Sequence, residues 1–332
     1  MSGRYEHERK VEEKMYEGLD GFPKVMYDYA EESAGRQKSS KAVFVNTVKR
    51  FITYLRDDLG YDVNDVDVWA TIKKRTIKDY FKKIKIKVNR RGETVELSSK
   101  TLNDYLISLN NFFEYLKEEE YITENPCPTK KEMSGIISDE VKEREVVVLT
   151  PEEVKEIRNH IYYNSRTPAR DACIFILGCR TGLRAQALSD IDESDIDFEN
   201  KKLTVIEKGK RHRTINLADD TIKLIRDCMR EKRQEMFVKD FDPLFVTVYR
   251  REPRRISKEN LAVIIEKYTA ITGKHITPHG LRRTNITAVY NETGDIAQAA
   301  RSAGHHNLAN TMRYINTEEK DRQMAKRVAE IF

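Results

Sequence analysis

Cysteine is scarce in this 332-residue sequence, and its four cysteines form no C-x-x-C pair. Cys127 and Cys228 stand alone, while Cys173 and Cys179 lie in or next to the apolar run 172–178. A buried thiol in such a run behaves as a small hydrophobic side chain. We therefore expect reduced thiols and an intracellular protein.

Long hydrophobic runs are also missing. The first ten residues contain no apolar segment of the kind found in a signal peptide, and no stretch approaches the length of a membrane span. We expect a soluble, cytoplasmic protein with no membrane partner.

The chain has little excess of charge of either sign, since 60 Lys and Arg face 55 Asp and Glu, for a net charge of +5. Charged residues make up 35% and hydrophobic residues 39% of the sequence, which suits a folded protein with extensive wet surface. Net charge alone leaves nucleic-acid binding undecided. Any affinity for DNA must come from basic residues that gather on one face.

What the chain does have is length and helical periodicity. At 332 residues it is too long for one core of usual size, so we expect two domains. Residues 1–37 read as a charged N-terminal segment, either an arm or a loosely packed helix after Pro23. Residues 38–128 read as a helical domain, with helices ending at Gly60, covering 68–84, and running from Ser98 or Ser99 to Leu116. Pro126 and Pro128 end this unit.

A second domain is expected at 150–332, after a charged linker at 129–149. Thr150-Pro151-Glu152-Glu153 has the pattern of a capping box that opens a helix. Short strands are expected at 196–198, 203–206 and 214–217, and later helices at 218–236, 257–272, 283–292 and 295–303. Asp295 and Gly304 have the pattern of N-cap and C′ residues. The predicted fold class is mostly α with a small antiparallel β-sheet (α+β).

Six side chains of this second domain form an ordered set suited to chemistry on a phosphodiester: Arg184, Lys208, His279, Arg282, His305 and Tyr314. Two guanidiniums can clamp the non-bridging oxygens, a lysine can protonate a leaving oxygen, and a phenol can attack phosphorus. His279 and Arg282 are three residues apart on a helix that opens after Pro278, and helix N-termini favour anions. A phenol with a pKa near ~10 needs nearby cations and a base to become a nucleophile.

Four of these residues have a plainer interpretation when each is taken alone. Arg184 fits a surface arginine, and Lys208 fits a solvated basic loop that contacts backbone phosphates. His305 fits a packing or surface histidine, and His306 competes with it for the same role. Tyr314, one of 16 tyrosines, fits an amphipathic core contact.

A metal site is the sharpest alternative for the histidines. His305 and His306 are adjacent, they have no carboxylates at ligand spacing, and the sequence contains no HExxH. We therefore expect no metal ligands among the site residues.

The ordered set closely resembles the tyrosine recombinase (phage integrase) family. The matching stretches are Thr181-Gly182-Leu183-Arg184, Lys208-Gly209, His279-Gly280-Leu281-Arg282-Arg283-Thr284, Gly304-His305 and Thr311-x-x-Tyr314. The resemblance is strong over 150–316 and weaker over 39–126, which is similar to the family's helical core-binding domain. It implies a two-domain clamp around double-stranded DNA, with the catalytic domain at 150–332.

The resemblance also implies a mechanism. Tyr314 would attack the scissile phosphate, leaving a 3′-phosphotyrosine and a free 5′ hydroxyl, and a hydroxyl from a partner strand would then rejoin the DNA. Arg184 and Arg282 would stabilise the pentacoordinate phosphorane, and Lys208 would act as general acid. His279 would accept the proton of Tyr314, and His305 would donate a hydrogen bond to the phosphate. The ester retains the bond energy, so no cofactor, ATP or metal is implied.

Further contacts follow from the same resemblance. Four basic residues are candidate DNA contacts: Lys210, Arg211, Arg213 and Arg283. The segment 318–332 carries an apolar stripe at helical spacing. It either covers its own core or, as in the family, docks onto a neighbouring protomer in a homo-tetramer assembled on two DNA sites. The resemblance therefore implies a cytoplasmic protein that associates with the DNA of the nucleoid.

Three positions depart from the family pattern. The acidic residue that usually stands three positions after the first arginine is replaced by Ala187, so Arg184 needs another support, and Asp190 is a candidate. Ala303 stands where leucine is common, and Asn316 replaces a histidine two positions after Tyr314. No expected reacting group is lost.

The expected function is site-specific DNA recombination, for integration or excision of a mobile element or for replicon resolution. Two alternatives stay open. One is a catalytically silent DNA-binding protein of the same fold, and the other is a strand-passage enzyme similar to a type IB topoisomerase.

Overall fold

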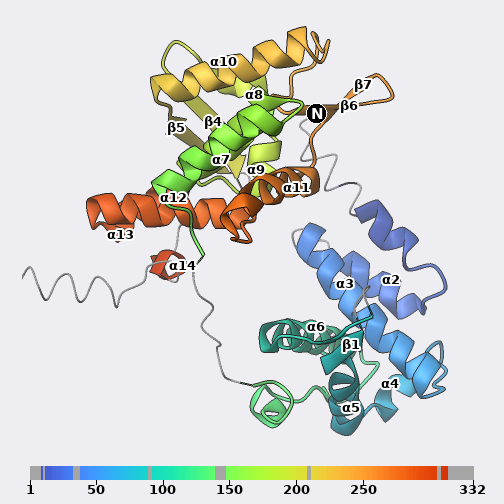
Figure 1. Ribbon diagram of the computed structural model, residues 1–332. Coiled ribbons are helices and arrows are strands. Elements are labelled where there is room, and N and C mark those ends of the chain that lie inside the picture. Colours follow the sequence, from blue (N-terminus) through green and yellow to red (C-terminus); the bar gives the residue numbers. More distant parts are fainter. Residues whose placement is uncertain are drawn as a thin grey trace, which may run out of the picture. The chain divides into compact units, whose positions relative to one another are not determined.

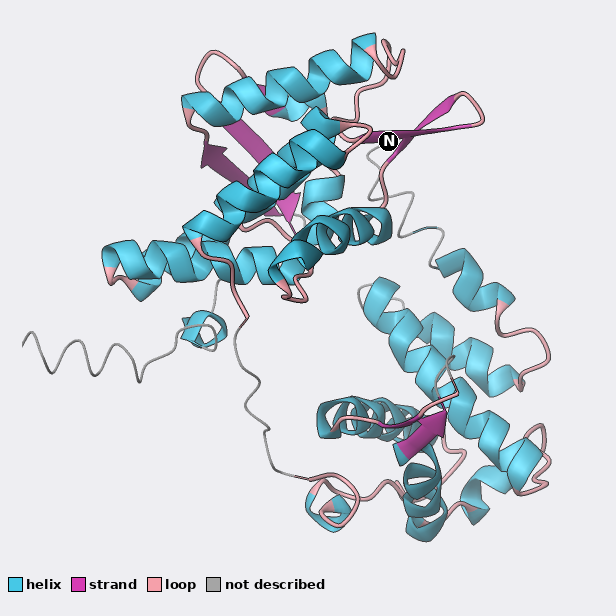
Figure 2. Ribbon diagram, viewed as in Figure 1, coloured by secondary structure: helices cyan, strands magenta, loops and turns pink. Residues whose placement is uncertain are grey.

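A computed structural model describes residues 9, 12–32, 38–88, 92–138, 147–207, 211–304 and 308–312. The described chain is mostly helical with small antiparallel sheets (Figure 2), which confirms the predicted fold class. It divides into two compact units, Met1–Glu143 and Arg144–Phe332 (Figure 1). Each unit has a hydrophobic core of its own.

The first unit is built from helices and one short hairpin. Its helices are α2 (Lys24–Glu32), α3 (Lys38–Thr53) with the π-helical η2 (Tyr54–Asp58), α4 (Val68–Thr71), α5 (Lys74–Lys85), α6 (Ser99–Glu118) and the 3-10 turn η3 (Lys131–Met133). Helix α6 begins where the sequence predicts, because the Ser98 side chain accepts a hydrogen bond from the Thr101 amide at 3.2 Å.

An aromatic cluster forms the centre of this unit. The Phe112 ring lies 5.6 Å from that of Trp69 and 5.2 Å from that of Tyr29, both edge-on. Tyr29 belongs to α2, so the expectation that this segment packs loosely is wrong. Met133 and Ile137, which fall in the expected linker, are also buried in this core.

The expected helix over 68–84 is interrupted. Ile72 (ψ 124°) and Lys73 (φ −111°, ψ 158°) are extended, and they separate α4 from α5. Ile72 is buried, so tertiary packing of this side chain overrides the helical propensity of the segment. Beyond α5, strands β1 (Ile86–Val88) and β2 (Thr94–Glu96) pair antiparallel and form a hairpin that the sequence did not predict.

The second unit surrounds a three-stranded antiparallel sheet. The strands β3 (Ile196–Asp197), β4 (Lys202–Glu207) and β5 (Arg211–Asn216) lie in that order. The helices are α7 (Pro151–Asn164), α8 (Pro168–Thr181), α9 (Ala185–Ser189), α10 (Asp219–Gln234), α11 (Lys258–Thr269), α12 (Pro278–Thr293), α13 (Ile296–Ala303) and α14 (Leu308–Met312), with the 3-10 turns η4 (Glu193–Asp195) and η5 (Ala270–Thr272).

Helix α8 is the central element of the second unit, and it packs against α7, α10 and α12. Its residues from Asp171 to Cys179 are all buried. The four cysteines of the chain are buried and unbridged, whereas the sequence indicated burial only for Cys173 and Cys179. Burial raises the pKa of Cys127 and of Cys179 to about 12, so these thiols stay protonated.

The predicted capping box opens α7. Thr150 accepts from the Glu153 amide at 3.2 Å, and Glu153 Oε2 accepts from the Thr150 amide at 2.8 Å. The same carboxylate accepts from Lys274 Nζ at 2.7 Å, which ties the start of α7 to the segment before α12. Among the residues described, none of the helices has the length and apolar character that a membrane crossing requires.

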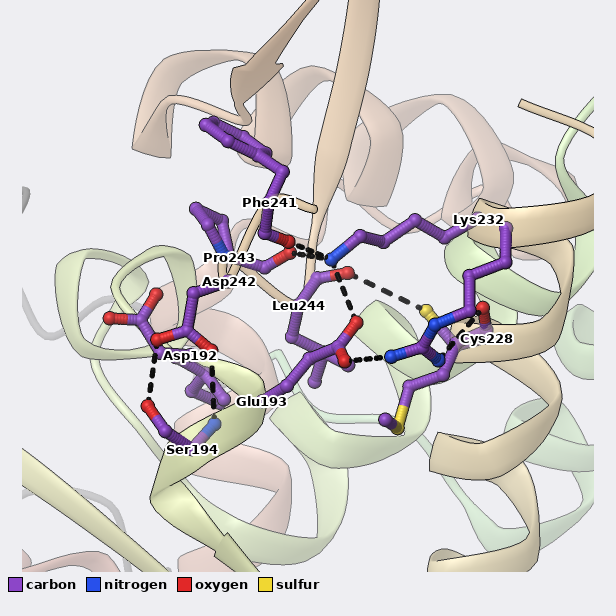
Figure 3. A network of polar contacts seen from close by, with 12 residues as sticks. Asp192, Glu193, Ser194, Cys228, Lys232, Phe241, Asp242, Pro243 and Leu244 are labelled. Carbon is purple, nitrogen blue, oxygen red and sulfur yellow. Dashed lines mark hydrogen bonds and ion pairs between the residues drawn. The ribbon is translucent and has the colours of Figure 1, made fainter. Parts of the chain in front are cut away.

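A polar network around Lys232 fixes the segment that leads into strand β6 (Val246–Tyr249) (Figure 3). The Lys232 side chain, on α10, is buried, and its Nζ donates to Glu193 Oε1 at 2.7 Å, to Pro243 O at 2.8 Å and to Phe241 O. Ser194 Oγ donates to Asp242 Oδ2 at 2.7 Å. Residues 241–244 are therefore fastened to α10 and to η4.

Strands β6 (Val246–Tyr249) and β7 (Glu252–Arg255) form a hairpin that the sequence analysis did not predict. Its two turn residues, Arg250 and Arg251, have φ of 52° and 66°. Such turns usually carry Asn or Gly. The turn signal was absent from the sequence, and the hairpin was missed.

Candidate active site

A left-handed glycine presents Arg184 from the packed end of α8. Gly182 has φ 58°, and its amide donates to Gly178 O at 3.2 Å. A Cβ at this position would lie 2.9 Å from Asn285 Oδ1, so glycine is required for the close approach of α12 as well as for the turn. Arg184 follows as the N-cap of α9, with 41% of its side chain exposed. Its guanidinium is therefore accessible and comes from a rigid turn.

Side chains of helix α12 donate hydrogen bonds to the backbone of the same turn. Arg282 Nη1 donates to Gly182 O at 2.7 Å, and Asn285 Nδ2 donates to Arg180 O at 2.8 Å. Arg282 is 1% exposed. Arg282 thus contacts the backbone two residues before Arg184, a supporting contact that the sequence did not reveal.

His279 lies in the first turn of α12. The helix begins at Pro278, and the Thr277 side chain caps it by accepting from the Gly280 amide at 3.3 Å. Desolvation by the surrounding chain lowers the pKa of His279, and the positive charges of Arg283, Arg282 and Arg184 lower it further. These charges place the imidazole in the same electrostatic cluster as the two arginines and favour its neutral form, which can accept a proton.

A buried carboxylate joins this cluster from the sheet. Glu207 ends β4, and its side chain is 5% exposed. Its Oε2 lies 3.3 Å from Arg184 Nη1, and its Oε1 lies 3.4 Å from Arg213 Nη1. The ion pair of Arg184 is therefore with Glu207. Asp190, the support considered from the sequence, accepts a hydrogen bond from Gln186 Nε2 at 2.9 Å.

The candidate DNA contacts differ in their surroundings. Arg213 is mostly buried, and its Nη2 donates to Thr181 O at 3.0 Å and to Ser302 O, so it supports the packing of the site. Arg211 is exposed on β5, opposite Glu207, and Arg283 is half-buried on α12. Lys210 lies outside the described residues.

Gly304 brings the end of α13 against Glu207. Gly304 has φ 68° as the C-cap of α13, and a Cβ on it would lie 2.7 Å from Glu207 Oε2. The sequence predicted Gly304 as a helix C′ residue from its position alone. The structure adds a second reason, because the carboxylate fills the space that a side chain would need.

Three members of the expected set are brought together here: Arg184, His279 and Arg282. The other three, Lys208, His305 and Tyr314, lie outside the described residues, as does the segment 318–332. Their roles stay predictions.

Sequence reasoning missed Glu207, although a signal was present. Leu203, Val205 and Glu207 alternate along β4, and all three are buried on one face. A carboxylate at an inward-facing position of a half-buried strand needs a cationic partner. The period-two pattern indicated such a site directly before Lys208 in the sequence.

Comparison with known proteins shows which family the chain matches. The profile described as the phage integrase family matches residues 147–321, which is more than half of the chain. The tyrosine recombinase XerC of Caldanaerobacter subterraneus subsp. tengcongensis is 28% identical over 285 residues, covering 83% of this chain and 75% of that protein. A tyrosine recombinase of Thermosipho africanus is 23% identical over 308 residues, covering 92% of this chain and 98% of that protein.

Solved structures show a similar fold. The XerH site-specific recombinase bound to difH substrate superposes with a TM-score of 0.65 at 17% identity, covering 96% of this chain and 88% of that one. The Tn1549 transposon integrase in complex with transposon right end DNA gives a TM-score of 0.63 at 18% identity, covering 92% and 99%.

Proposed function

The chain belongs to the phage integrase family, and we propose that it is a tyrosine-type site-specific recombinase that cleaves and rejoins DNA. One observation carries the proposal most directly. Arg282 donates a hydrogen bond to the carbonyl oxygen of Gly182, two residues before Arg184, and the charges of both arginines act on His279. Two guanidiniums beside a neutral imidazole can stabilise a phosphorane and accept the proton of an attacking phenol.

The proposed reaction uses Tyr314 as the nucleophile. Its oxygen attacks the scissile phosphorus, the bond to the 5′ oxygen breaks, and Lys208 donates a proton to that leaving oxygen. His279 accepts the proton of Tyr314, and His305 donates a hydrogen bond to the phosphate. The 5′ hydroxyl of a partner strand then displaces Tyr314, which restores a phosphodiester. The protein–DNA ester retains the bond energy, so the reaction consumes no ATP and needs no cofactor.

Double-stranded DNA is the proposed substrate. The similar XerH and Tn1549 integrase structures are described as complexes with DNA, which supports the same class of partner here. In the proposed complex, the first unit (Met1–Glu143) is a core-binding domain and the second unit (Arg144–Phe332) is the catalytic domain, and the two would clamp the duplex. The protein would act at the nucleoid in the cytoplasm.

We also propose that four copies assemble on two DNA sites, with the tail helix 318–332 docked onto a neighbouring protomer. This part rests on the apolar stripe of the tail. Deleting residues 320–332 is expected to weaken assembly on DNA without loss of binding by one protomer, which gel mobility shift assays on one-site and two-site duplexes would measure. Unchanged assembly would contradict tail exchange.

Strand exchange tests the proposed function. A random duplex library, nicked so that the cleaved end diffuses away, would be incubated with the protein, and covalently captured DNA would be sequenced to find the target site. Two plasmids carrying the recovered site are then expected to recombine, and Tyr314→Phe is expected to abolish the exchange. Relaxation of supercoiled plasmids without any site would favour the topoisomerase alternative, whereas tight binding with no capture would favour the silent DNA-binding protein.

A further inference from the structure

We propose that Glu207 is a positioning residue for Arg184 and takes the place of the acidic residue that is missing at position 187. The inference rests on the proposed function, in which Arg184 contacts the scissile phosphate. Its geometric basis is the approach of Glu207 Oε2 to Arg184 Nη1 at 3.3 Å. Ala187, on α9, is itself buried and has no carboxylate to offer.

The position of this carboxylate is fixed by its surroundings. Only 5% of the Glu207 side chain is exposed, and a desolvated carboxylate is stable only when it is paired. Arg213 provides the second partner, and Arg213 is itself held by the carbonyl oxygens of Thr181 and Ser302. Glu207 therefore lies on a rigid base formed by the end of α8 and the end of α13.

Arg184 needs such support because it is a long side chain that is partly exposed. Its backbone is fixed by the contact of Arg282 with Gly182 O, but this contact leaves the guanidinium free to rotate about its own side-chain bonds. Glu207 restricts that rotation. A cation that is already oriented when DNA arrives stabilises developing charge without reorganisation.

The carboxylate does not cancel the positive charge of the site. Arg184, Arg213 and Arg282 together carry more charge than one carboxylate removes, and His279 lies in the same cluster. The site therefore keeps its attraction for a phosphate. The role of Glu207 is orientation of Arg184 rather than neutralisation.

The same side chain adjoins two further parts of the proposed active site. Lys208 follows Glu207 in the sequence. His305 follows Gly304, whose missing Cβ leaves the space that Glu207 Oε2 occupies. Glu207 is thus adjacent in sequence to the proposed general acid, and its carboxylate lies against the residue that precedes the proposed hydrogen-bond donor.

The test removes the carboxylate at position 207 and then introduces one at position 187. Single-turnover rates of covalent adduct formation would be measured on the captured duplex, at saturating and subsaturating DNA, for wild type, Glu207→Gln and Glu207→Gln with Ala187→Glu. Glu207→Gln is expected to lower the maximal rate about tenfold or more. This effect is smaller than the ~10²–10³-fold loss expected when a whole catalytic donor is removed. The DNA concentration that gives half of the maximal rate is expected to stay unchanged. Ala187→Glu is expected to restore part of the rate.

Asp197→Asn is the matched control, because Asp197 is a carboxylate of the same sheet that accepts a hydrogen bond from Asn200 Nδ2 at 2.8 Å in the turn before β4. It is expected to react at the wild-type rate. All rates are taken below the melting temperature of each variant, and Glu207→Asp replaces Glu207→Gln if the latter does not fold. A Glu207 variant that reacts as fast as wild type overturns the proposal. Absence of an adduct with the wild type refutes the proposed function instead, so the two failures are distinguishable.

Discussion

Arg282 Nη1 donates a hydrogen bond of 2.7 Å to the carbonyl oxygen of Gly182, two residues before Arg184. One proposed catalytic arginine thus fixes the backbone that presents the other. Since Arg282 is buried and Arg184 is partly exposed, the two side chains are expected to differ in what their loss does to stability.

Replacing either arginine by alanine is therefore expected to abolish most activity but to affect folding unequally. Arg184→Ala is expected to lower the rate of adduct formation by ~10²–10³ with little change in melting temperature. Arg282→Ala is expected to lower the rate at least as much and also to lower the melting temperature, because the Gly182 carbonyl loses its buried donor. Thermal unfolding would show whether the melting temperatures of the two variants differ. Equal melting temperatures would contradict the supporting role of Arg282.

The lowered pKa of His279 predicts a pH dependence. The neutral imidazole is the proposed proton acceptor, so the rate of adduct formation is expected to rise with pH, with its midpoint below pH 6.5. His279→Gln is expected to remove this rise and to slow the reaction throughout. A midpoint above pH 6.5, or a rise that survives in the variant, would argue against the assignment.

The same pKa affects stability. The unfolded chain, in which His279 has its ordinary pKa, takes up a proton first as the pH falls, so protonation favours unfolding. Between pH 6.5 and the lowered pKa of the folded state, the free energy of unfolding is expected to decrease with falling pH, and below that pKa the decrease ends. Denaturant titrations of wild type and His279→Gln at several pH values would show whether the difference between them follows this course.

Gly304 and Gly294 form a matched pair for a test of the contact with Glu207. Both are helix C-caps, with φ of 68° and 67°, but a Cβ on Gly304 meets Glu207 Oε2 at 2.7 Å, while one on Gly294 meets nothing within 4 Å. Alanine at either site is expected to cost about 1–2 kcal/mol of backbone strain. Only Gly304→Ala is expected to lose further stability and to slow adduct formation. Equal effects in thermal unfolding and in the adduct assay would contradict the close approach of Glu207.

The network around Lys232 predicts a purely structural effect (Figure 3). Lys232→Met leaves the carbonyl oxygens of Phe241 and Pro243 without their buried donor, and Glu193 loses its buried partner and keeps the ion pair with Arg233. A loss of about 3–5 kcal/mol in the free energy of unfolding is expected, as for other broken buried ion pairs. Arg230→Met, which removes an exposed partner of Asp227 on the same helix, is expected to cost less than about 1 kcal/mol. Chemical denaturation would compare the two, and a tolerated Lys232→Met would show that the network is dispensable.

Much of the fold was predictable because its signals are local. Ser98, the Thr150–Glu153 box and the Asp295–Gly304 pair mark helix ends through hydrogen bonds between residues close in sequence. Ile72 and Tyr29 were misjudged because their positions depend on burial against distant segments. The β6–β7 hairpin was missed because Arg250 and Arg251 adopt turn conformations that their residue type does not announce.

The candidate site also has one part that was predictable from local sequence and one part that was not. The spacing of His279 and Arg282 on one helix is local, and the structure places them as expected. Glu207 lies 23 residues beyond Arg184 in the sequence, so their ion pair depends on how β4 packs against the α8–α9 turn. No pattern within a short window contains that information, although the inward position of Glu207 on β4 hinted that it needs a partner.

Mapping the protein–DNA bond tests the central claim most directly. After incubation with a nicked duplex that carries the captured site, the protein would be digested, and the peptide that bears the DNA 3′ phosphate would be identified by mass spectrometry. We predict attachment at Tyr314 and no adduct with Tyr314→Phe. Attachment at another residue, or an adduct that persists in Tyr314→Phe, would contradict the account.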